Sequence, residues 1–494
     1  MRRSYFLVAV FVALLAVSAI VAVSRPGQAS GCPSLLAGHV AKSELASTSF
    51  GAVTKFSLPP ARWPNAIAVA PDGSVWFGEE AVPGLAHLYV SNGTLVEYSF
   101  PGTNAASPPQ GYNCKDRAYI WGVALWDGRI WASDSAQNRL VGLSPSNDTF
   151  KVVSLAETDS EPYTLTPGPD DALWFTQVRA GQIGTYFANG TLVEHSVQVP
   201  EWLNNASAPV EVPGVPAQIV FVNSTTGYYV DASPLINGSA IFSFDPARFS
   251  PEQVGGRNQS LSDPDSIALG DGGIWLAQHA DSSLAFYDPE KASWTIYPTS
   301  GVGYIGTTLP YFVETNGSLV WFNEHFGNRM AVLDVPNKTL TEYSLSNPPA
   351  SNISQIDNAL TFALGEGRAW FTESTANAIG YLDASYQPSF SVSANDSSLT
   401  LRRGENASLL VNVRGDSLSP VSIKLSSYAW KTTVGGNITM QAGEGEIYPL
   451  EGNQSLNVNV DVGLGSAPGN YTLLVTASDG LISCSVYVEL SVLP

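Results

Sequence analysis

Polar residues recur at one position of a repeated sequence unit, directly after an aromatic strand, as in IAVAPDGSVWFGE and FALGEGRAWFTE. The residues at this position are Glu79, Asp134, Gln177, Asp231, Gln278, Glu324 and Glu373. Carboxylate oxygens are the ligands that Mg²⁺ and Ca²⁺ prefer. If the units share one axis, the carboxylates predict a cation site at one opening, formed by Glu79, Asp134, Asp231, Glu324 and Glu373. The alternative is that these residues are polar only because they meet water.

Two histidines directly follow strand-end residues in neighbouring units, in the segments WLAQH and WFNEH. Imidazole is a good general base near neutral pH. The candidate catalytic residues are therefore His325, Glu324, Glu373 and His279. The competing interpretation is that both imidazoles point sideways into the edge of the unit, because they stand one residue beyond the strand end.

The repeated units predict a seven-bladed β-propeller over residues 50–387. Third strands such as QIGTYF and fourth strands such as LVEYSF complete each unit, and four short strands at a period of about 50 residues are typical of a propeller blade. Asn92-Gly93 and Asn189-Gly190 predict tight turns between third and fourth strands. The second strands open with Trp76, Trp131, Trp174, Tyr228, Trp275, Trp321 and Trp370. We expect their Trp and Phe side chains to pack between blades.

The last unit lacks a fourth strand, whereas VTKFSLP (Val53–Pro59) precedes the first unit as an isolated one. We therefore expect this N-terminal strand to complete the last blade, which would remove an exposed sheet edge. From residue 388 to 494 the repeat is replaced by alternation with period two, which predicts an immunoglobulin-like β-sandwich. Such modules act as spacers or attachment modules.

Export across a membrane is predicted by two arginines followed by an apolar run, Tyr5–Val23. Residues 1–30 are either a cleaved signal peptide or a retained membrane anchor in the form of one hydrophobic helix. Asn-x-Ser/Thr triplets are typical of a glycosylated extracellular protein. They begin at Asn92, Asn147, Asn189, Asn205, Asn223, Asn237, Asn258, Asn316, Asn337, Asn352, Asn395, Asn406, Asn437, Asn453 and Asn470.

The net charge of −20 disfavours nucleic acid and anionic lipid surfaces as partners. Contact with a membrane is expected only through the N-terminal segment. Cys484 alternates with apolar residues and is expected to be a buried free thiol, whereas Cys32 and Cys114 are able to form one disulfide. No GxSxG, HExxH, Walker or CxxC pattern is present.

The sequence pattern of the repeated units, with WFTE followed by N-x-I-G and a closing E-Y-x-L, resembles that of the streptogramin B lyase (virginiamycin B lyase) family over most of residues 56–384. This resemblance implies a seven-bladed propeller and Mg²⁺-assisted opening of a cyclic peptide lactone. It also implies catalytic histidines in Pro-His pairs that open the innermost strands. The corresponding residues here are Asn65, Trp121, Tyr163, Ala217, Asp265, Tyr311 and Asn358, and none is histidine.

These sequence features are compatible with two functions. The first is an extracytoplasmic, cell-surface propeller, anchored or secreted, that binds a small ligand or a surface protein without lyase activity. The second is a metal-dependent carbon–oxygen lyase or lactonase with Mg²⁺ or Ca²⁺ on the strand-end carboxylates.

Overall fold

The computed structural model describes residues 40–102, 119–201, 210–232, 239–256, 261–300, 308–350, 355–357, 359–415, 422–428, 438–442 and 452–494. The chain divides into two compact units. Unit 1 comprises residues 1–269 and 354–384, and unit 2 comprises residues 270–353 and 385–494. Within the described ranges, no helix is both long enough and apolar enough to cross a membrane. The predicted N-terminal segment, Cys32 and Cys114 lie outside these ranges.

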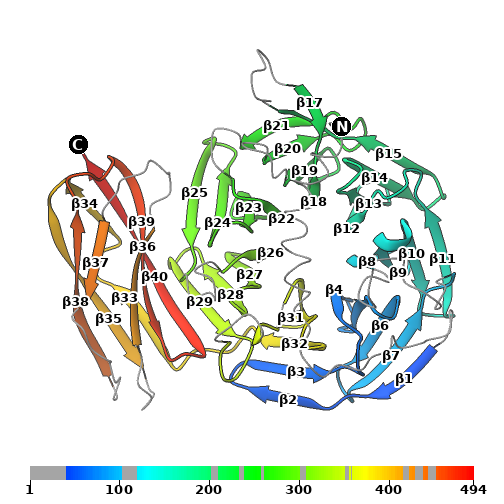
Figure 1. The fold of residues 1–494 in the computed structure, drawn as a ribbon, viewed down its shortest axis with the longest axis horizontal. Helices are drawn as coiled ribbons and strands as arrows, with labels where there is room; N and C mark the ends of the chain where they lie inside the picture. The colour runs from blue at the N-terminus through cyan, green and yellow to red at the C-terminus, as the bar shows by residue number, and fades with distance from the viewer. Residues whose placement is uncertain are drawn as a thin grey trace, which may run out of the picture. The chain divides into compact units, whose positions relative to one another are not determined.

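Unit 1 is built from consecutive four-stranded antiparallel sheets, as the repeat predicts. Within each set of four, the strands lie side by side in chain order (Figure 1), and the sheet that contains β3 and β32 is the exception. The first two sheets contain β4 (Pro64–Val69), β5 (Val75–Glu79), β6 (Gly84–Tyr89), β7 (Thr94–Ser99), β8 (Ile120–Trp126), β9 (Arg129–Asp134), β10 (Arg139–Ser144) and β11 (Thr149–Ser154). The next two contain β12 (Pro162–Gly168), β13 (Ala172–Gln177), β14 (Gln182–Phe187), β15 (Leu192–Ser196), β18 (Pro216–Asn223), β19 (Thr226–Asp231), β20 (Ala240–Phe244) and β21 (Glu252–Gly256).

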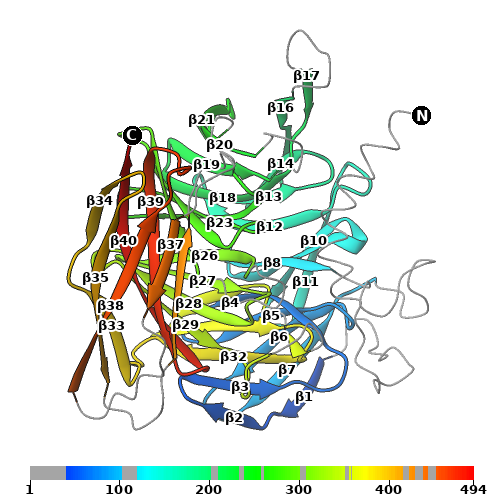
Figure 2. The same ribbon diagram turned by 60° about the vertical axis from the view of Figure 1, so that its left-hand side comes forward.

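Shorter elements complete unit 1. β1 (Val40–Glu44) adds a fifth strand beside β7, and β22 (Pro264–Gly270) reaches the boundary between the units. The strands β16 (Gln198–Glu201) and β17 (Val210–Pro213) form a separate hairpin (Figure 2). The two predicted Asn-Gly turns do join third to fourth strands, and their glycines have positive φ, 70° at Gly93 and 90° at Gly190.

The N-terminal strand completes the last repeated unit, as predicted. That sheet has the order β2-β3-β32-β31-β30. β3 (Val53–Ser57) pairs antiparallel with β32 (Ala378–Asp383), and β2 (Ser47–Phe50) pairs with the outer edge of β3. β31 (Arg368–Glu373) and β30 (Phe362–Gly365) follow on the other side of β32. Segments more than 300 residues apart in the sequence therefore share one sheet.

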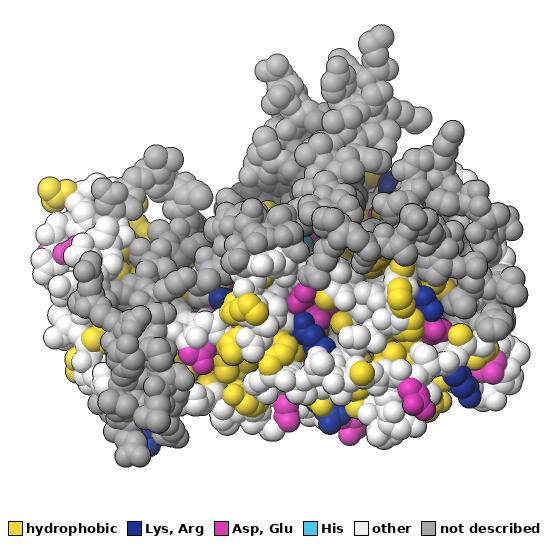
Figure 3. All heavy atoms as spheres, turned by 60° about the horizontal axis from the view of Figure 1, so that its bottom comes forward, with side chains coloured by type: hydrophobic (Ala, Val, Ile, Leu, Met, Phe, Trp, Pro, Cys, Tyr) yellow, Lys and Arg dark blue, Asp and Glu magenta, His cyan; other side chains and the backbone are white. Residues whose placement is uncertain are grey.

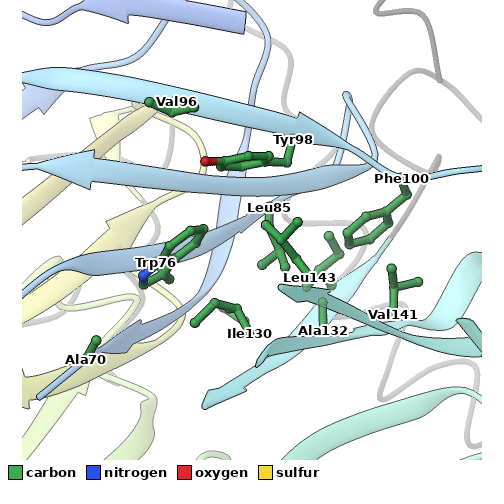
Figure 4. Close-up of a cluster of buried hydrophobic side chains, with 12 residues drawn as sticks. Ala70, Trp76, Leu85, Val96, Tyr98, Phe100, Ile130, Ala132, Val141 and Leu143 are labelled. Carbon is green, nitrogen blue, oxygen red and sulfur yellow. The ribbon is translucent and has the colours of Figure 1, made fainter. Parts of the chain in front are cut away.

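Aromatic pairs in the second strands fill the spaces between neighbouring sheets, as expected. Trp76 packs in a buried cluster with Ile130 and Leu143 of the next sheet (Figure 4). The adjacent Phe77 points to the opposite face, where it packs in a cluster with Trp370. Because successive side chains of a strand point to opposite faces, one Trp-Phe pair joins its sheet to both neighbours.

Unit 2 contains two further blade-like sets of strands and the C-terminal strands. Its first set is β23 (Gly273–Gln278), β24 (Ser283–Asp288) and β25 (Ser293–Pro298). Its second set is β26 (Pro310–Asn316), β27 (Leu319–Glu324), β28 (Arg329–Asp334) and β29 (Thr339–Ser344).

The second set does not end at β29. The antiparallel partner of β29 is β40 (Ile482–Leu493), so the sheet continues through β40 and β39 (Gly469–Ser478) to β36 (Ser422–Tyr428). β34 (Ser398–Arg402) pairs parallel with the second half of β40. The C-terminal segment is therefore hydrogen-bonded to a blade, which the expectation of a spacer did not include.

The other C-terminal sheet has the order β33-β35-β38-β37 (Figure 2). Its strands are β33 (Phe390–Ala394), β35 (Asn406–Gly415), β38 (Gly452–Val462) and β37 (Ile438–Ala442). At the start of β39, the Tyr471 hydroxyl donates a hydrogen bond of 2.5 Å to the Ala467 carbonyl. Cys484 is a buried free thiol, as predicted.

Candidate functional site

The strand-end residues of unit 1 are buried rather than solvated. Glu79, Asp134, Gln177, Asp231 and Glu373 are each at most 1% exposed. The alternative that they are polar because they meet water is therefore wrong. Burial without a partner would be costly for these groups, so their immediate neighbours decide what they do.

Glu373 forms an ion pair with Lys55 of β3, in which Nζ and Oε1 are 2.7 Å apart. Lys55 also donates a hydrogen bond of 3.0 Å to Asp357. Burial is the main cause that raises the pKa of Glu373 to about 8, and Lys55 opposes the rise. The last predicted carboxylate thus lies beside a cation from the closing strand.

Glu79 shares its surroundings with a second carboxylate, Glu97 of β7. Arg62 donates a hydrogen bond to Glu97, and its Nε lies 4.0 Å from Glu79 Oε1. Burial is the main cause that raises the pKa of Glu79 well above its ordinary value, and the charge of Glu97 adds to the rise. The carboxylate that repels Glu79 therefore belongs to the same sheet, and not to the strand end of another repeat.

Asp134, Asp231 and Gln177 also have partners close by. Arg139 Nε donates a hydrogen bond of 2.8 Å to Asp134, whose pKa rises to about 6 chiefly because of burial. The Asp231 carboxylate accepts the backbone N–H of Val215 at 2.8 Å. Gln177 Nε2 donates to Glu194 Oε1 at 2.9 Å. Each strand end in unit 1 therefore carries its own local polar cluster.

In unit 2, Glu324 repeats the arrangement of Glu79. It is fully buried, and burial together with the nearby Glu342 of β29 raises its pKa well above the ordinary value. Arg329 Nη1 lies 3.4 Å from Glu342 Oε2 and also donates to the Ser300 hydroxyl at 3.0 Å. Gln278 donates a hydrogen bond of 2.8 Å to Ser283.

The two candidate histidines come together. His279 Nε2 and His325 Nε2 are 3.4 Å apart, and the ring of Tyr311 contacts both imidazoles. His325 is only 2% exposed, and burial together with His279 holds its pKa well below the usual value. His325 is therefore neutral at physiological pH, which is the state of a base. Catalytic roles for His325, Glu324, Glu373 and His279 stay a prediction.

The residues that stand at the start of the innermost strands, where the resemblance would place histidines, are all described except Asn358. Asn65 is fully buried and donates to Glu80 at 2.9 Å. Trp121 and Tyr163 pack against each other with ring centroids 5.2 Å apart. Asn65 thus presents an amide, and Trp121 and Tyr163 present aromatic rings, in place of imidazoles.

Sequence reasoning missed the residues that accompany the strand-end carboxylates, above all Lys55, Glu97 and Glu342. The sequence did contain a signal for the two glutamates, because Glu97 and Glu342 are the first residues of the E-Y-x-L pattern in the fourth strands. Lys55 holds the equivalent position in VTKFSLP, since it pairs with Gly380 as Glu97 pairs with Ala86. The closing strand therefore supplies a cation at the position where β7 and β29 supply the anions Glu97 and Glu342.

A groove with a volume of about 1650 Å³ was also not expected. It lies in unit 1 over the turns that join β4 to β5, β6 to β7, β8 to β9 and β30 to β31. Its lining includes Asp72, Trp76, Tyr89, Asn92 and Arg368. On the molecular face in Figure 3, basic and acidic side chains of the described residues are interspersed.

No family model and no curated protein matches the chain, whereas solved structures do match it. A streptogramin B lyase aligns with a TM-score of 0.52 and 21% identity, over 67% of this chain and 96% of that chain. Virginiamycin B lyase from Staphylococcus aureus aligns with a TM-score of 0.53 and 19% identity, over 67% and 98%.

A catalytically inactive variant of the same enzyme with quinupristin aligns with a TM-score of 0.53 and 18% identity, also over 67% and 98%. At such low identity the likeness establishes the β-propeller fold and leaves the activity open.

Proposed function

We propose that this chain is an extracytoplasmic, cell-surface β-propeller that binds a small ligand or a protein partner and lacks the lyase reaction. The observation that carries the proposal is the 2.7 Å ion pair between Lys55 and Glu373. A carboxylate that faces its own lysine is a poor ligand for Mg²⁺ or Ca²⁺, because the bound cation would have to displace or face the ammonium group.

Two further observations support this proposal. Asp134 has its own arginine at 2.8 Å, so a second predicted ligand is engaged within its blade. None of the inner-strand openings carries the histidine that the resemblance requires. Metal binding by Glu79, Asp134, Asp231, Glu324 and Glu373 remains part of the alternative function.

The architecture that we propose is a seven-bladed propeller over residues 50–387 and an immunoglobulin-like sandwich over residues 388–494. The sandwich assignment is supported by the strand orders β33-β35-β38-β37 and β36-β39-β40. These match the ABED and CFG sheets of that fold, and Tyr471 matches its tyrosine corner. Residues 1–30 would direct export and then either anchor the chain or be removed.

Titration calorimetry and a turnover assay test the proposal on the full chain. Mg²⁺, Ca²⁺ and Mn²⁺ are titrated in turn, and quinupristin is then incubated with each mixture and analysed by mass spectrometry. We expect no heat of specific binding and no ring-opened product. Metal-dependent opening that disappears in Glu373→Gln, with the fold retained, would overturn the proposal.

The second candidate function is a metal-dependent carbon–oxygen lyase or lactonase, and the histidine pair favours it. The two imidazoles, whose Nε2 atoms are 3.4 Å apart, would in that case supply the base that accepts a proton from a substrate carbon or a water molecule. In that case His325→Gln and His279→Gln would each lower kcat by roughly 100-fold or more. The matched control is His195→Gln, a histidine of the fourth strand β15.

A further inference from the structure

The turn between β6 and β7 combines an exposed aromatic ring with an exposed Asn-x-Thr triplet. Tyr89 closes β6 and is 44% exposed. Asn92 lies at the tip of the turn, and Thr94 opens β7 directly across from Tyr89. Tyr89 and Asn92 both line the groove of about 1650 Å³. The Tyr89 ring packs against His87, with ring centroids 4.0 Å apart, and the rest of its surface remains open to a further apolar contact.

The backbone holds this turn in a fixed shape. The N–H groups of Asn92 and Gly93 both donate to the Tyr89 carbonyl, at 3.3 and 2.9 Å. The Asn92 Oδ1 atom accepts the N–H of Thr94 at 3.0 Å. Among the described residues, the side-chain nitrogen of Asn92 has no hydrogen-bond partner.

A second blade of unit 1 has a related turn, in which the aromatic ring is half-buried and packs against a core cluster. The turn between β14 and β15 holds Phe187, Asn189 and Thr191, with the Gly190 N–H donating to the Phe187 carbonyl at 2.9 Å. Asn189 Oδ1 accepts the Thr191 N–H at 2.8 Å, as in the first turn. An aromatic side chain therefore stands two or three residues before the asparagine in both turns.

Two equivalent turns lack the aromatic and serve as internal contrasts. Asn147 follows Ser144, and its Oδ1 also accepts the Thr149 hydroxyl at 2.7 Å. Asn337 donates its own side-chain nitrogen to Asp334 at 2.8 Å, so that nitrogen is already engaged. The turn geometry alone thus does not require an aromatic residue.

We propose that Asn92 carries an N-linked glycan whose first sugar packs on the ring of Tyr89 and extends over the groove. The C–H face of a sugar is apolar and its edges are hydroxyls, which suits an exposed aromatic ring beside polar turns. The proposal rests on the export that is part of the proposed function, because the modification requires an exported chain.

The chemical step is a glycosyl transfer from a lipid-linked oligosaccharyl phosphate. The Asn92 side-chain nitrogen forms a bond to C1 of the sugar and gives up one proton. The bond between C1 and the phosphate oxygen breaks, and the lipid phosphate leaves with the electron pair. Thr94 supplies the hydroxyl that the acceptor triplet requires two residues after the asparagine.

Glycopeptide mass spectrometry on the full chain, purified from the cells that naturally make it, tests the attachment. We expect saccharide mass on the peptide that contains Asn92 and none in Asn92→Asp, which keeps the oxygen that accepts the Thr94 N–H. An unmodified Asn92 on a chain found outside the cytoplasm overturns this inference alone. A chain that stays in the cytoplasm overturns the export on which both proposals rest.

A double-mutant cycle tests the packing on Tyr89. In the glycosylated protein, Tyr89→Ala should lower Tm by about 2 °C more than it does in the Asn92→Asp background. The control cycle combines Tyr89→Ala with Asn337→Asp, which we expect to be additive. Equal losses in both Asn92 backgrounds would overturn the contact between the sugar and the ring.

Discussion

Lys55 Nζ lies 2.7 Å from Glu373 Oε1, which links the strand before the first repeated unit to the second strand of the last one. Lys55 reaches Glu373 from β3, which pairs with β32 next to β31. One side chain therefore both neutralises a buried carboxylate and marks the place where the two ends of the repeat meet.

Lys55→Met should cost on the order of 3 kcal/mol of unfolding free energy, because Glu373 and Asp357 lose their shared cation. Urea denaturation at pH 9, where Glu373 with its pKa of about 8 is ionised, measures the loss. Lys291→Met is the matched control, since its ion pair with Asp288 is exposed to solvent and should contribute little. Adding Glu373→Gln to Lys55→Met should recover part of the loss, and a full additive loss would contradict the pairing.

Stability should fall as the pH rises from about 4.5 to about 8. The pKa of Glu373 is raised from 4.5 to about 8 by burial, so the folded chain keeps a proton in this window that the unfolded chain has released. The slope for one such group is at most about 1.4 kcal/mol per pH unit. Asp134 acts in the same direction up to its pKa of about 6.

The measurement is the unfolding free energy of wild type and Glu373→Gln at several pH values. We expect the variant to reduce the slope between pH 6 and 8, above the range in which Asp134 contributes, by the share of one group, while Glu79 and Glu324 keep their contributions. Glu366→Gln, a substitution of an exposed carboxylate in the same sheet, is the control. An unchanged slope in Glu373→Gln would mean that another group is responsible.

Removal of the closing strand should destabilise unit 1 strongly. A chain that begins after Pro59 loses β3 and leaves an unpaired edge on β32, whereas one that begins at Ala46 loses β1 among the described strands and keeps the closing pairing. We expect thermal unfolding of the shorter chain to begin several degrees lower than that of the longer one. Identical melting curves would show that β3 contributes nothing to closure.

Sequence patterns predicted the elements well wherever the repeat fixed them. The closing strand was predictable because VTKFSLP matches a fourth strand and the last unit lacks one. The positions of Glu79 and Glu373 at strand ends were predictable for the same reason. Their burial was not, because it depends on how neighbouring sheets pack, which a one-dimensional period does not encode.

The partners of the carboxylates were hidden for a different reason. Lys55 and Glu373 are separated by most of the propeller sequence, and only the register of β3 on β32 places them side by side. The histidine pair was proposed from position alone. The 3.4 Å contact between His279 and His325 depends on side-chain directions that the motif WFNEH does not specify.

The long strand β40 has a mechanical consequence. Its first half is hydrogen-bonded to β29 from Val486 to Ile482, and its second half is bonded to β34. Tension applied at Pro494 would therefore be carried directly into the blade that contains β29, with no intervening flexible joint to absorb it.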